Sequence, residues 1–137
     1  MERLKTIPVT EYTTPSPMTL GPETPVRRIF ELMETNSIRH FPVVEDGKPV
    51  GIISSRDLNI LAGYDLVDDL NAGDIMIPEP FTAGVQSGLD EVVFTMSREK
   101  IGSVLILEED DSIYGIFTST DALNALIEVL RGDCEAL

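Results

Sequence analysis

The sequence predicts an α/β (α+β) fold that is built twice, from two related repeats. Shifting the chain by 63 residues superposes its first half on its second half, and one extra residue in an acidic turn then changes the shift to 64. Each half also carries the same order of patterns, namely short strand, helix, strand, strand, helix. Identical residues at matching positions include Thr19 and Thr82, Gly21 and Gly84, Met33 and Met96, Gly51 and Gly115, and Asp57 and Asp121.

The first helix of each repeat is predicted by its apolar spacing. Apolar residues recur at i, i+3, i+4 and i+7, which places them on one face of a helix. Thr24 is expected to cap the first of these helices, with Pro25 at its first position. The apolar residues are Val26, Ile29, Phe30 and Met33 in the first copy and Leu89, Val92, Val93 and Met96 in the second.

A β-hairpin and a second helix follow in each repeat. The apolar segments "HFPVV" and "VGII" flank the turn "EDGK", and "SVLIL" and "YGIF" flank the turn "EEDDS". The stretches "SSRDLNILAG" and "STDALNALIEVLRG" then predict helices. Gly63 and Gly132 are expected to end these helices in the left-handed conformation.

The predicted organisation is repeat 1 at residues 9–63, a connecting segment at 64–80 and repeat 2 at 81–131. Each repeat is expected to form a small mixed sheet with two packing helices. A single copy of this size buries too little apolar surface to be stable alone. The two sheets are therefore expected to pack against each other about a pseudo-twofold axis.

Composition argues against several functions. The net charge of −14 repels nucleic-acid backbones and anionic lipid surfaces, so neither partner is expected. The apolar runs are far shorter than the roughly 20 residues of a membrane helix, and no signal peptide is recognisable. Cys134, the single cysteine, cannot form an internal disulfide, so a reducing cytoplasm is the simplest location. Neither a catalytic motif nor a metal-ligand spacing is present, so an enzyme is not expected.

The phrases "VGIISSRDL" and "YGIFTSTDA" each place a hydroxyl residue where a strand meets a helix, with an aspartate three positions later. One interpretation is helix capping, in which Ser54 or Thr118 is the N-cap and Asp57 or Asp121 completes a capping box. The other is a nucleotide site. The helix start then offers N–H groups to a phosphate, and the aspartate accepts the vicinal hydroxyls of a ribose. The two roles can coexist.

The whole arrangement resembles a tandem pair of cystathionine β-synthase (CBS) domains, also called a Bateman module. The resemblance rests on "DIMIPEPFT", on "RHFPVVEDGKPVGIISSRDL" and on its echo "GSVLILEEDDSIYGIFTSTDAL", and it covers residues 9–131. It implies a ligand of the adenosine class, namely AMP, ADP, ATP or S-adenosylmethionine, bound in clefts between the repeats. It implies no catalytic cofactor.

The resemblance also implies which residues form each cleft. In both clefts the hydroxyl residue and the aspartate come from one repeat, while other contacts come from the second repeat. Cleft one would contain Arg39, His40, Ile52, Ser54, Arg56, Asp57, Met76, Phe81, Ile101 and Gly102. Cleft two would contain Thr13, Met18, Ile38, Arg39 (through its backbone), Ser103, Ile116, Thr118 and Asp121.

The two clefts are predicted to differ in charge. Arg39, His40 and Arg56 can approach a phosphate in cleft one, and charge-assisted hydrogen bonds are stronger than neutral ones. The matching positions for cleft two are Gly102, Ser103 and Thr120, none of which is cationic. His40 is the single histidine, and a hydrogen-bonded structural role stays open for it.

Two functions follow from these expectations. The first is a regulatory sensor that binds an adenine nucleotide and signals its occupancy to an unknown partner protein. The alternative is a structural or oligomerisation domain with vestigial clefts. A homodimer is expected by the resemblance, with the apolar faces of the helices at 26–33 and 89–96 as its surface.

Overall fold

The computed structural model describes residues 7–63 and 65–132. The chain divides into two compact units, one formed by Pro17–Pro80 and the other by Met1–Ser16 together with Phe81–Leu137. The described residues before Pro17 therefore pack with the second repeat, because strand β1 (Thr14–Pro15) pairs with a strand of that repeat. The repeat boundaries along the sequence stay a prediction.

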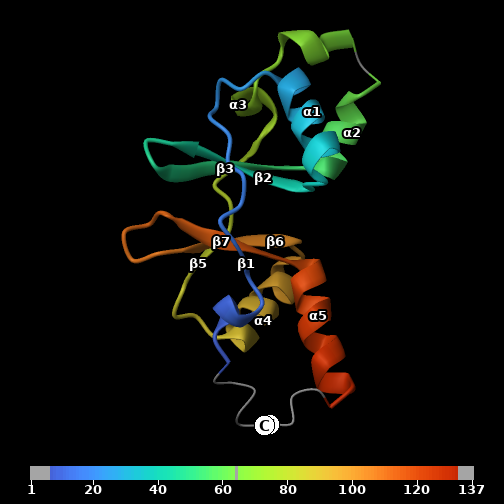
Figure 1. Cartoon of the computed structure of the whole chain (residues 1–137). Coiled ribbons are helices and arrows are strands. Elements are labelled where there is room, and N and C mark those ends of the chain that lie inside the picture. Colours follow the sequence, from blue (N-terminus) through green and yellow to red (C-terminus); the bar gives the residue numbers. More distant parts are fainter. Residues whose placement is uncertain (1–6, 64, 133–137) are drawn as a thin grey trace. The chain divides into compact units, whose positions relative to one another are not determined.

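The unit at 17–80 contains one antiparallel sheet with helices on one face (Figure 1). Strand β3 is central, with β2 on one side and β4 on the other. An isolated parallel bridge joins Leu20 to Val43 and extends this sheet beyond β2. The elements are α1 (Val26–Asn36), β2 (His40–Glu45), β3 (Lys48–Ser54), α2 (Ser55–Leu61), η3 (Asp65–Asp69), α3 (Ala72–Ile75) and β4 (Ile77–Pro78).

The core of this unit forms where α1 and α2 lie on the sheet. Val26 and Ile29 of α1 are fully buried, and Phe30 and Met33 pack beside them. The predicted apolar face of this helix is thereby confirmed. Its partners in the buried cluster are Leu20, Phe41, Val43, Ile53, Leu58 and Ala72.

The other unit has a mixed sheet in the order β1-β7-β6-β5, in which β5 and β6 are parallel and the remaining pairs antiparallel. Val92 and Met96 of its first helix are buried in the core, which again confirms the predicted apolar face. The predicted α/β (α+β) class with two small sheets is confirmed. Besides β1, the elements are η2 (Val9–Glu11), β5 (Thr82–Gly84), α4 (Leu89–Glu99), β6 (Ser103–Leu107), β7 (Ile113–Thr118) and α5 (Ser119–Leu130).

Two predicted helix ends are wrong, and one is confirmed. Pro25 is itself the N-cap of α1, in extended conformation, so Thr24 does not cap this helix. Gly132 has φ +74°, the left-handed conformation expected beyond α5. Gly63 does not adopt a positive φ, because the chain leaves α2 through Ala62 in the right-handed region.

Candidate functional site

The predicted hydroxyl and aspartate residues lie at two strand-to-helix junctions, one in each unit. In the first, β3 ends at Ser54 and α2 begins at the next residue, and in the second β7 ends at Thr118 and α5 begins. The register of each hairpin places the start of the neighbouring strand opposite the hydroxyl residue. His40 is paired with Ser54, and Ser103 is paired with Thr118. The structure therefore brings these predicted residues together within each unit.

The first junction is held by a capping box between Ser54 and Asp57. The Ser54 hydroxyl donates to Asp57 Oδ2 at 2.9 Å, and the Ser54 N–H donates to the same oxygen at 3.3 Å. In return the Asp57 N–H donates to Ser54 Oγ at 3.3 Å. Both side chains are half-buried. The capping interpretation is therefore confirmed here.

The second junction repeats this geometry with Thr118 and Asp121. The Thr118 N–H donates to Asp121 Oδ2 at 2.8 Å, and its hydroxyl donates to the same oxygen at 3.2 Å. The Asp121 N–H donates to Thr118 Oγ1 at 3.4 Å. A serine and a threonine thus serve the same role, as the paired motifs predicted.

Each capping box uses only one oxygen of its carboxylate. Within the described chain, Oδ1 of Asp57 and Oδ1 of Asp121 form no hydrogen bond and no ion pair. A carboxylate oxygen has two acceptor positions, so each Oδ1 can receive hydroxyl groups while Oδ2 still caps the helix. Capping and ligand binding are compatible at both junctions.

Acidic residues also accept hydrogen bonds at the starts of two other helices, and they can be compared with the two junction aspartates. Asp74 Oδ2 accepts from the Asn71 N–H at 2.8 Å at the start of α3. Glu91 Oε1 accepts from the Gly88 N–H at 3.1 Å at the start of α4. Both side chains are exposed, whereas Asp57 and Asp121 are half-buried at the end of a strand. Capping alone does not require the half-buried position.

The backbone leaves fewer N–H groups for a phosphate than the sequence indicated. The Ser55 N–H donates to the Arg39 carbonyl at 2.8 Å, and the Ser119 N–H donates to the Gly102 carbonyl at 3.0 Å. The third N–H of each helix is already used in the capping box. An anionic group at either junction therefore depends mainly on side-chain donors.

Two glycines bring further predicted residues to the junction strands. A Cβ on Gly51 would lie 2.4 Å from Met76 Sδ, so the Met76 side chain lies directly on β3. A Cβ on Gly115 would lie 2.6 Å from Thr13 Cγ2 and 2.5 Å from the Thr14 carbonyl oxygen. Met76 and Thr13 thus occupy equivalent places, next to Ile52 and Ile116 respectively.

The short strands β1 and β4 carry these contacts. A short strand was expected ahead of the first helix of each repeat, but its bounds and its partner were not predicted. Thr14 lies opposite Ile116, and Ile77 lies opposite Ile52. A signal was present in the dipeptides at 14–15 and 77–78, because a residue before proline is restricted to extended conformation. Their strand partners are set by long-range contacts that the sequence pattern does not reveal.

Each predicted cleft also contains residues from the other unit. For cleft one these are Phe81, Ile101 and Gly102, and for cleft two they are Met18, Ile38 and Arg39. The structure describes each unit by itself, so the combination of residues from both units stays a prediction.

The two junctions differ in the charge of the side chains at matching positions. Arg39 and Arg56 are exposed, and within the described residues neither forms an ion pair. His40 is half-buried and has an interaction partner. The corresponding positions of the second junction are Gly102, Ser103 and Thr120, which carry no charge.

Across residues 7–63 and 65–132, no group of three or more His, Cys, Asp or Glu side chains could hold a metal ion. None of the helices in these residues has the length and apolar character needed to cross a membrane. Cys134 lies outside the described residues.

A family model for the CBS domain matches residues 9–60 and again residues 72–128. An inosine-5'-monophosphate dehydrogenase from Thermoplasma acidophilum is 30% identical over 105 residues, which are 77% of this chain. The chain spans about a fifth of that relative's length, since the match covers 21% of it.

Solved structures are similar over nearly all of the chain. A Vibrio cholerae protein whose name, AcuB, ascribes it to acetoin utilization is 30% identical with a TM-score of 0.80, covering 95% of this chain and 97% of its own. The CBS domain pair of protein MJ0100, in complex with 5'-methylthioadenosine and S-adenosyl-L-methionine, is 26% identical with a TM-score of 0.75. That match covers 87% of this chain and 98% of the other.

Proposed function

Because the chain belongs to the CBS domain family, with two copies of the domain in tandem, we propose that it is a regulatory module that binds an adenosine-containing ligand. The ligand class comprises AMP, ADP, ATP and S-adenosylmethionine. The module reports ligand occupancy to a partner protein and does not itself catalyse a reaction. Its expected location is the cytoplasm.

The observation that carries this proposal is the second oxygen of each junction aspartate. Asp57 Oδ1 and Asp121 Oδ1 stay available while Oδ2 caps the helix. A ribose presents two adjacent hydroxyl donors, and a carboxylate is the acceptor that suits them. Each junction can therefore bind a ribose through Oδ1 while the hydrogen bonds of Oδ2 still cap the helix.

Comparison with a solved relative supports the ligand class. The CBS pair of MJ0100 was crystallised with two adenosine derivatives, neither of which carries a phosphate. The shared group of those two ligands is the adenosine moiety, which includes the ribose. This agrees with a site in which the aspartate recognises ribose and the remaining contacts select the 5' substituent.

A structural scaffold is the second candidate, and the capping boxes favour it. They account for Ser54, Asp57, Thr118 and Asp121 without any ligand. The two functions differ in one respect that can be measured. A scaffold loses only stability when an aspartate is removed, whereas a ligand site also loses affinity.

Calorimetric titration with AMP, ATP, S-adenosylmethionine and 5'-methylthioadenosine tests the proposal. We expect Asp57→Ala to weaken adenylate binding at least tenfold, since a hydrogen bond to a charged group contributes about 1.5–3 kcal/mol. Asp74→Ala is the matched control, because Asp74 closes a helix start in the same way but lies outside both junctions. Both variants should lose about 1 kcal/mol of stability.

Unchanged affinity in Asp57→Ala and in Asp121→Ala, together with lowered melting temperatures, would show that the two aspartates only cap their helices. No binding of any of the four ligands to the wild-type protein would establish the scaffold function instead. Native mass spectrometry of protein purified without added ligand provides an independent measurement. A retained adenosine-containing molecule supports the sensor, and the same spectrum reports the oligomeric state.

The protein is also proposed to form a homodimer. A small protein that exposes a contiguous apolar surface tends to associate, and a second copy can cover that surface. The apolar faces of α1 and α4, expected from the sequence as that surface, are instead packed into the two cores. The self-association surface therefore has to lie elsewhere.

A further inference from the structure

A pocket of about 220 Å³ lies between helix α4 and the edge of its sheet at β5. Its walls come from β5, from the turn before α4, from α4 itself and from β6, which all belong to one unit. Apart from Phe81, none of the residues that line it belongs to a predicted cleft. The pocket is therefore separate from the two strand-to-helix junctions.

The internal repeat shows how this pocket is formed. At a shift of 63, four of its lining positions match larger side chains of the other unit, which lie in or against the buried core of that unit. The matching pairs are Leu20 and Ala83, Ile29 and Val92, Leu32 and Thr95, and Phe41 and Val104. Smaller side chains at all four positions leave space between helix and sheet, and space that stays unfilled costs stability. The pocket is thus a local departure from the fold that the two units share.

Three polar side chains line the pocket beside its apolar wall. Ser87 precedes the N-cap of α4, and Glu91 and Thr95 lie one turn apart on the same face of the helix. Glu91 Oε1 accepts from the Gly88 N–H at 3.1 Å, while Oε2 forms no hydrogen bond or ion pair within the described residues. The Thr95 hydroxyl donates to the Glu91 carbonyl at 3.1 Å, so its oxygen can still accept. The pocket therefore offers several hydrogen-bond acceptors.

The charge of the pocket is negative. Glu91 is the ionisable side chain among those that line it, and the matching residue of the other unit is Arg28. The start of α4 carries about half a positive charge from the helix dipole, which Asp90 and Glu91 together outweigh. Arg98, farther along α4, is engaged with the Phe94 ring at 5.3 Å from its centroid. Because the whole protein is also acidic, a cationic ligand is favoured and an anionic one is disfavoured.

We propose that this pocket binds a small organic cation, an ammonium group on an apolar or aromatic body. An ammonium has three donors, and Ser87, Glu91 and Thr95 supply acceptors for them. The apolar body packs against Val104 and against the exposed ring of Phe81. The volume lies below the range of about 300–1,000 Å³ for drug-sized ligands, so the ligand is small. This site is independent of adenosine binding at the junctions.

Titration of the isotope-labelled whole chain with benzylamine tests the proposal by NMR. Benzylamine is protonated at neutral pH, and benzyl alcohol and benzoate are its neutral and anionic counterparts of similar size. We expect benzylamine to perturb backbone amides of β5 and α4 and to bind at least about tenfold more tightly than benzyl alcohol, because its donors meet a charged acceptor. Benzoate should leave these amides unperturbed.

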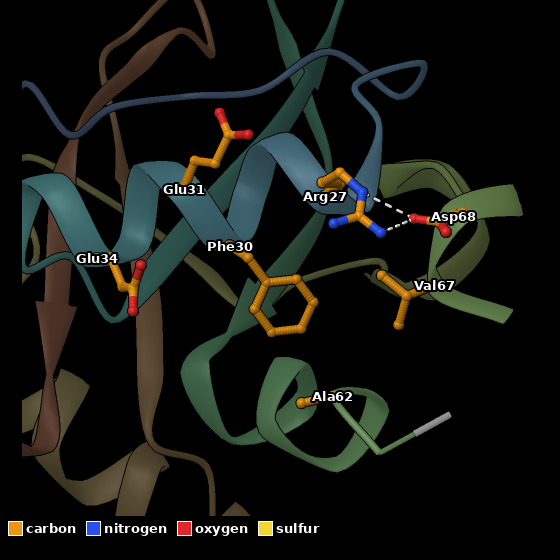
Figure 2. Close-up of a pocket in the computed structure, with 7 residues that line it drawn as sticks. All are labelled: Arg27, Phe30, Glu31, Glu34, Ala62, Val67 and Asp68. Carbon is orange, nitrogen blue, oxygen red and sulfur yellow. Dashed lines mark hydrogen bonds and ion pairs between the residues drawn. The ribbon is translucent and has the colours of Figure 1, made fainter. Parts of the chain in front are cut away.

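Glu91→Gln removes the charge of the pocket but keeps an acceptor for the Gly88 N–H. It should weaken benzylamine binding about tenfold and leave the affinity for benzyl alcohol unchanged. Glu34→Gln is the matched control, because it changes the net charge by the same amount. Glu34 is on α1 and lines a different pocket, which also contains the Arg27–Asp68 ion pair (Figure 2). This control should bind benzylamine like the wild-type protein.

Filling the pocket with the residues of the other unit gives a second measurement. Ala83→Leu with Val104→Phe should abolish binding of both benzylamine and benzyl alcohol, while circular dichroism shows that the fold is kept. Thr95→Leu makes the same test with one half-buried substitution if the double variant loses its native spectrum.

Three outcomes would overturn the proposal. The first is equal affinity for benzylamine and benzyl alcohol, and the second is undiminished benzylamine affinity in Glu91→Gln. The third is a set of chemical-shift changes confined to the two junctions, at Ser54 and Asp57 or at Thr118 and Asp121. The amine would then bind at a junction, and the pocket beside α4 would have no cationic ligand.

Discussion

At the scale of single residues, Gly51 and Gly115 each allow a second segment to approach closely, but the approaching atoms differ. Each lets another segment cross a junction strand so closely that a Cβ would overlap with it. At Gly51 the overlap is with the Met76 side chain, and at Gly115 it includes the Thr14 carbonyl oxygen. A thioether side chain can change rotamer, whereas a paired backbone cannot move without disrupting β1.

We therefore expect Gly115→Ala to be the more damaging substitution. It should lower the free energy of unfolding by about 2–3 kcal/mol, near the upper end for overpacking. Gly51→Ala should cost about 1 kcal/mol, because Met76 can move aside. Urea denaturation of both variants measures the difference. Equal losses would show that Met76 is as fixed as the β1 backbone.

At the scale of elements, helix α2 and helix α5 begin alike and end differently. Both start with a hydroxyl N-cap and an aspartate three residues later. Beyond α5, Gly132 has φ +74°, while Gly63 beyond α2 does not have a positive φ. A Cβ added at either position would meet no other atom within 4 Å, so backbone conformation alone distinguishes the two glycines.

These two glycines form a matched pair for substitution. Gly132→Ala should destabilise the protein by about 1 kcal/mol, because alanine resists the left-handed conformation. Gly63→Ala should be neutral or stabilise by up to about 1 kcal/mol, since alanine restricts the unfolded chain. Thermal unfolding followed by circular dichroism checks both changes. A loss of stability in Gly63→Ala as large as that in Gly132→Ala would contradict the different backbone conformations of the two glycines.

The elements show what a single sequence can predict and what it cannot. The stripe from Val26 to Met33 predicted a helix and its buried face, because amphipathic spacing reflects local geometry. The capping residues at both junctions were also predicted from the sequence. The pairing of Thr14 with Ile116 was not, because it joins residues about 100 positions apart. The exposure of apolar residues on α5, such as Leu126 and Leu130, was also not predicted, because apolar spacing does not reveal what a helix face packs against.

At the scale of the whole molecule, charge decides how an anionic ligand is captured. A protein of net charge −14 repels a phosphate unless local cations offset the field. The first junction has Arg39 and Arg56 exposed beside it. The second junction has no cation at the matching positions. Phosphate recognition, unlike ribose recognition, is therefore expected to differ between the two.

We predict that AMP or ATP occupies the Ser54/Asp57 cleft before the other. Affinity there should fall about tenfold in Arg39→Ala, as expected for loss of a charged contact of roughly 1.5 kcal/mol. It should also fall when salt is raised from about 0.1 M to about 1 M, because the screening length shrinks from ~10 Å to ~3 Å. Titration calorimetry at both salt concentrations measures these effects.

Two controls separate local charge from general electrostatics in this last experiment. Arg98→Ala removes another exposed arginine, on α4, and changes the net charge by the same amount, so it should leave the affinity nearly unchanged. Adenosine lacks phosphate and should discriminate far less between the clefts. Chemical shifts of backbone amides identify which junction fills first. Shifts that begin at Thr118 and Asp121, while Ser54 and Asp57 stay unperturbed, would reverse the predicted order, because the cations of the first junction would then contribute nothing to capture.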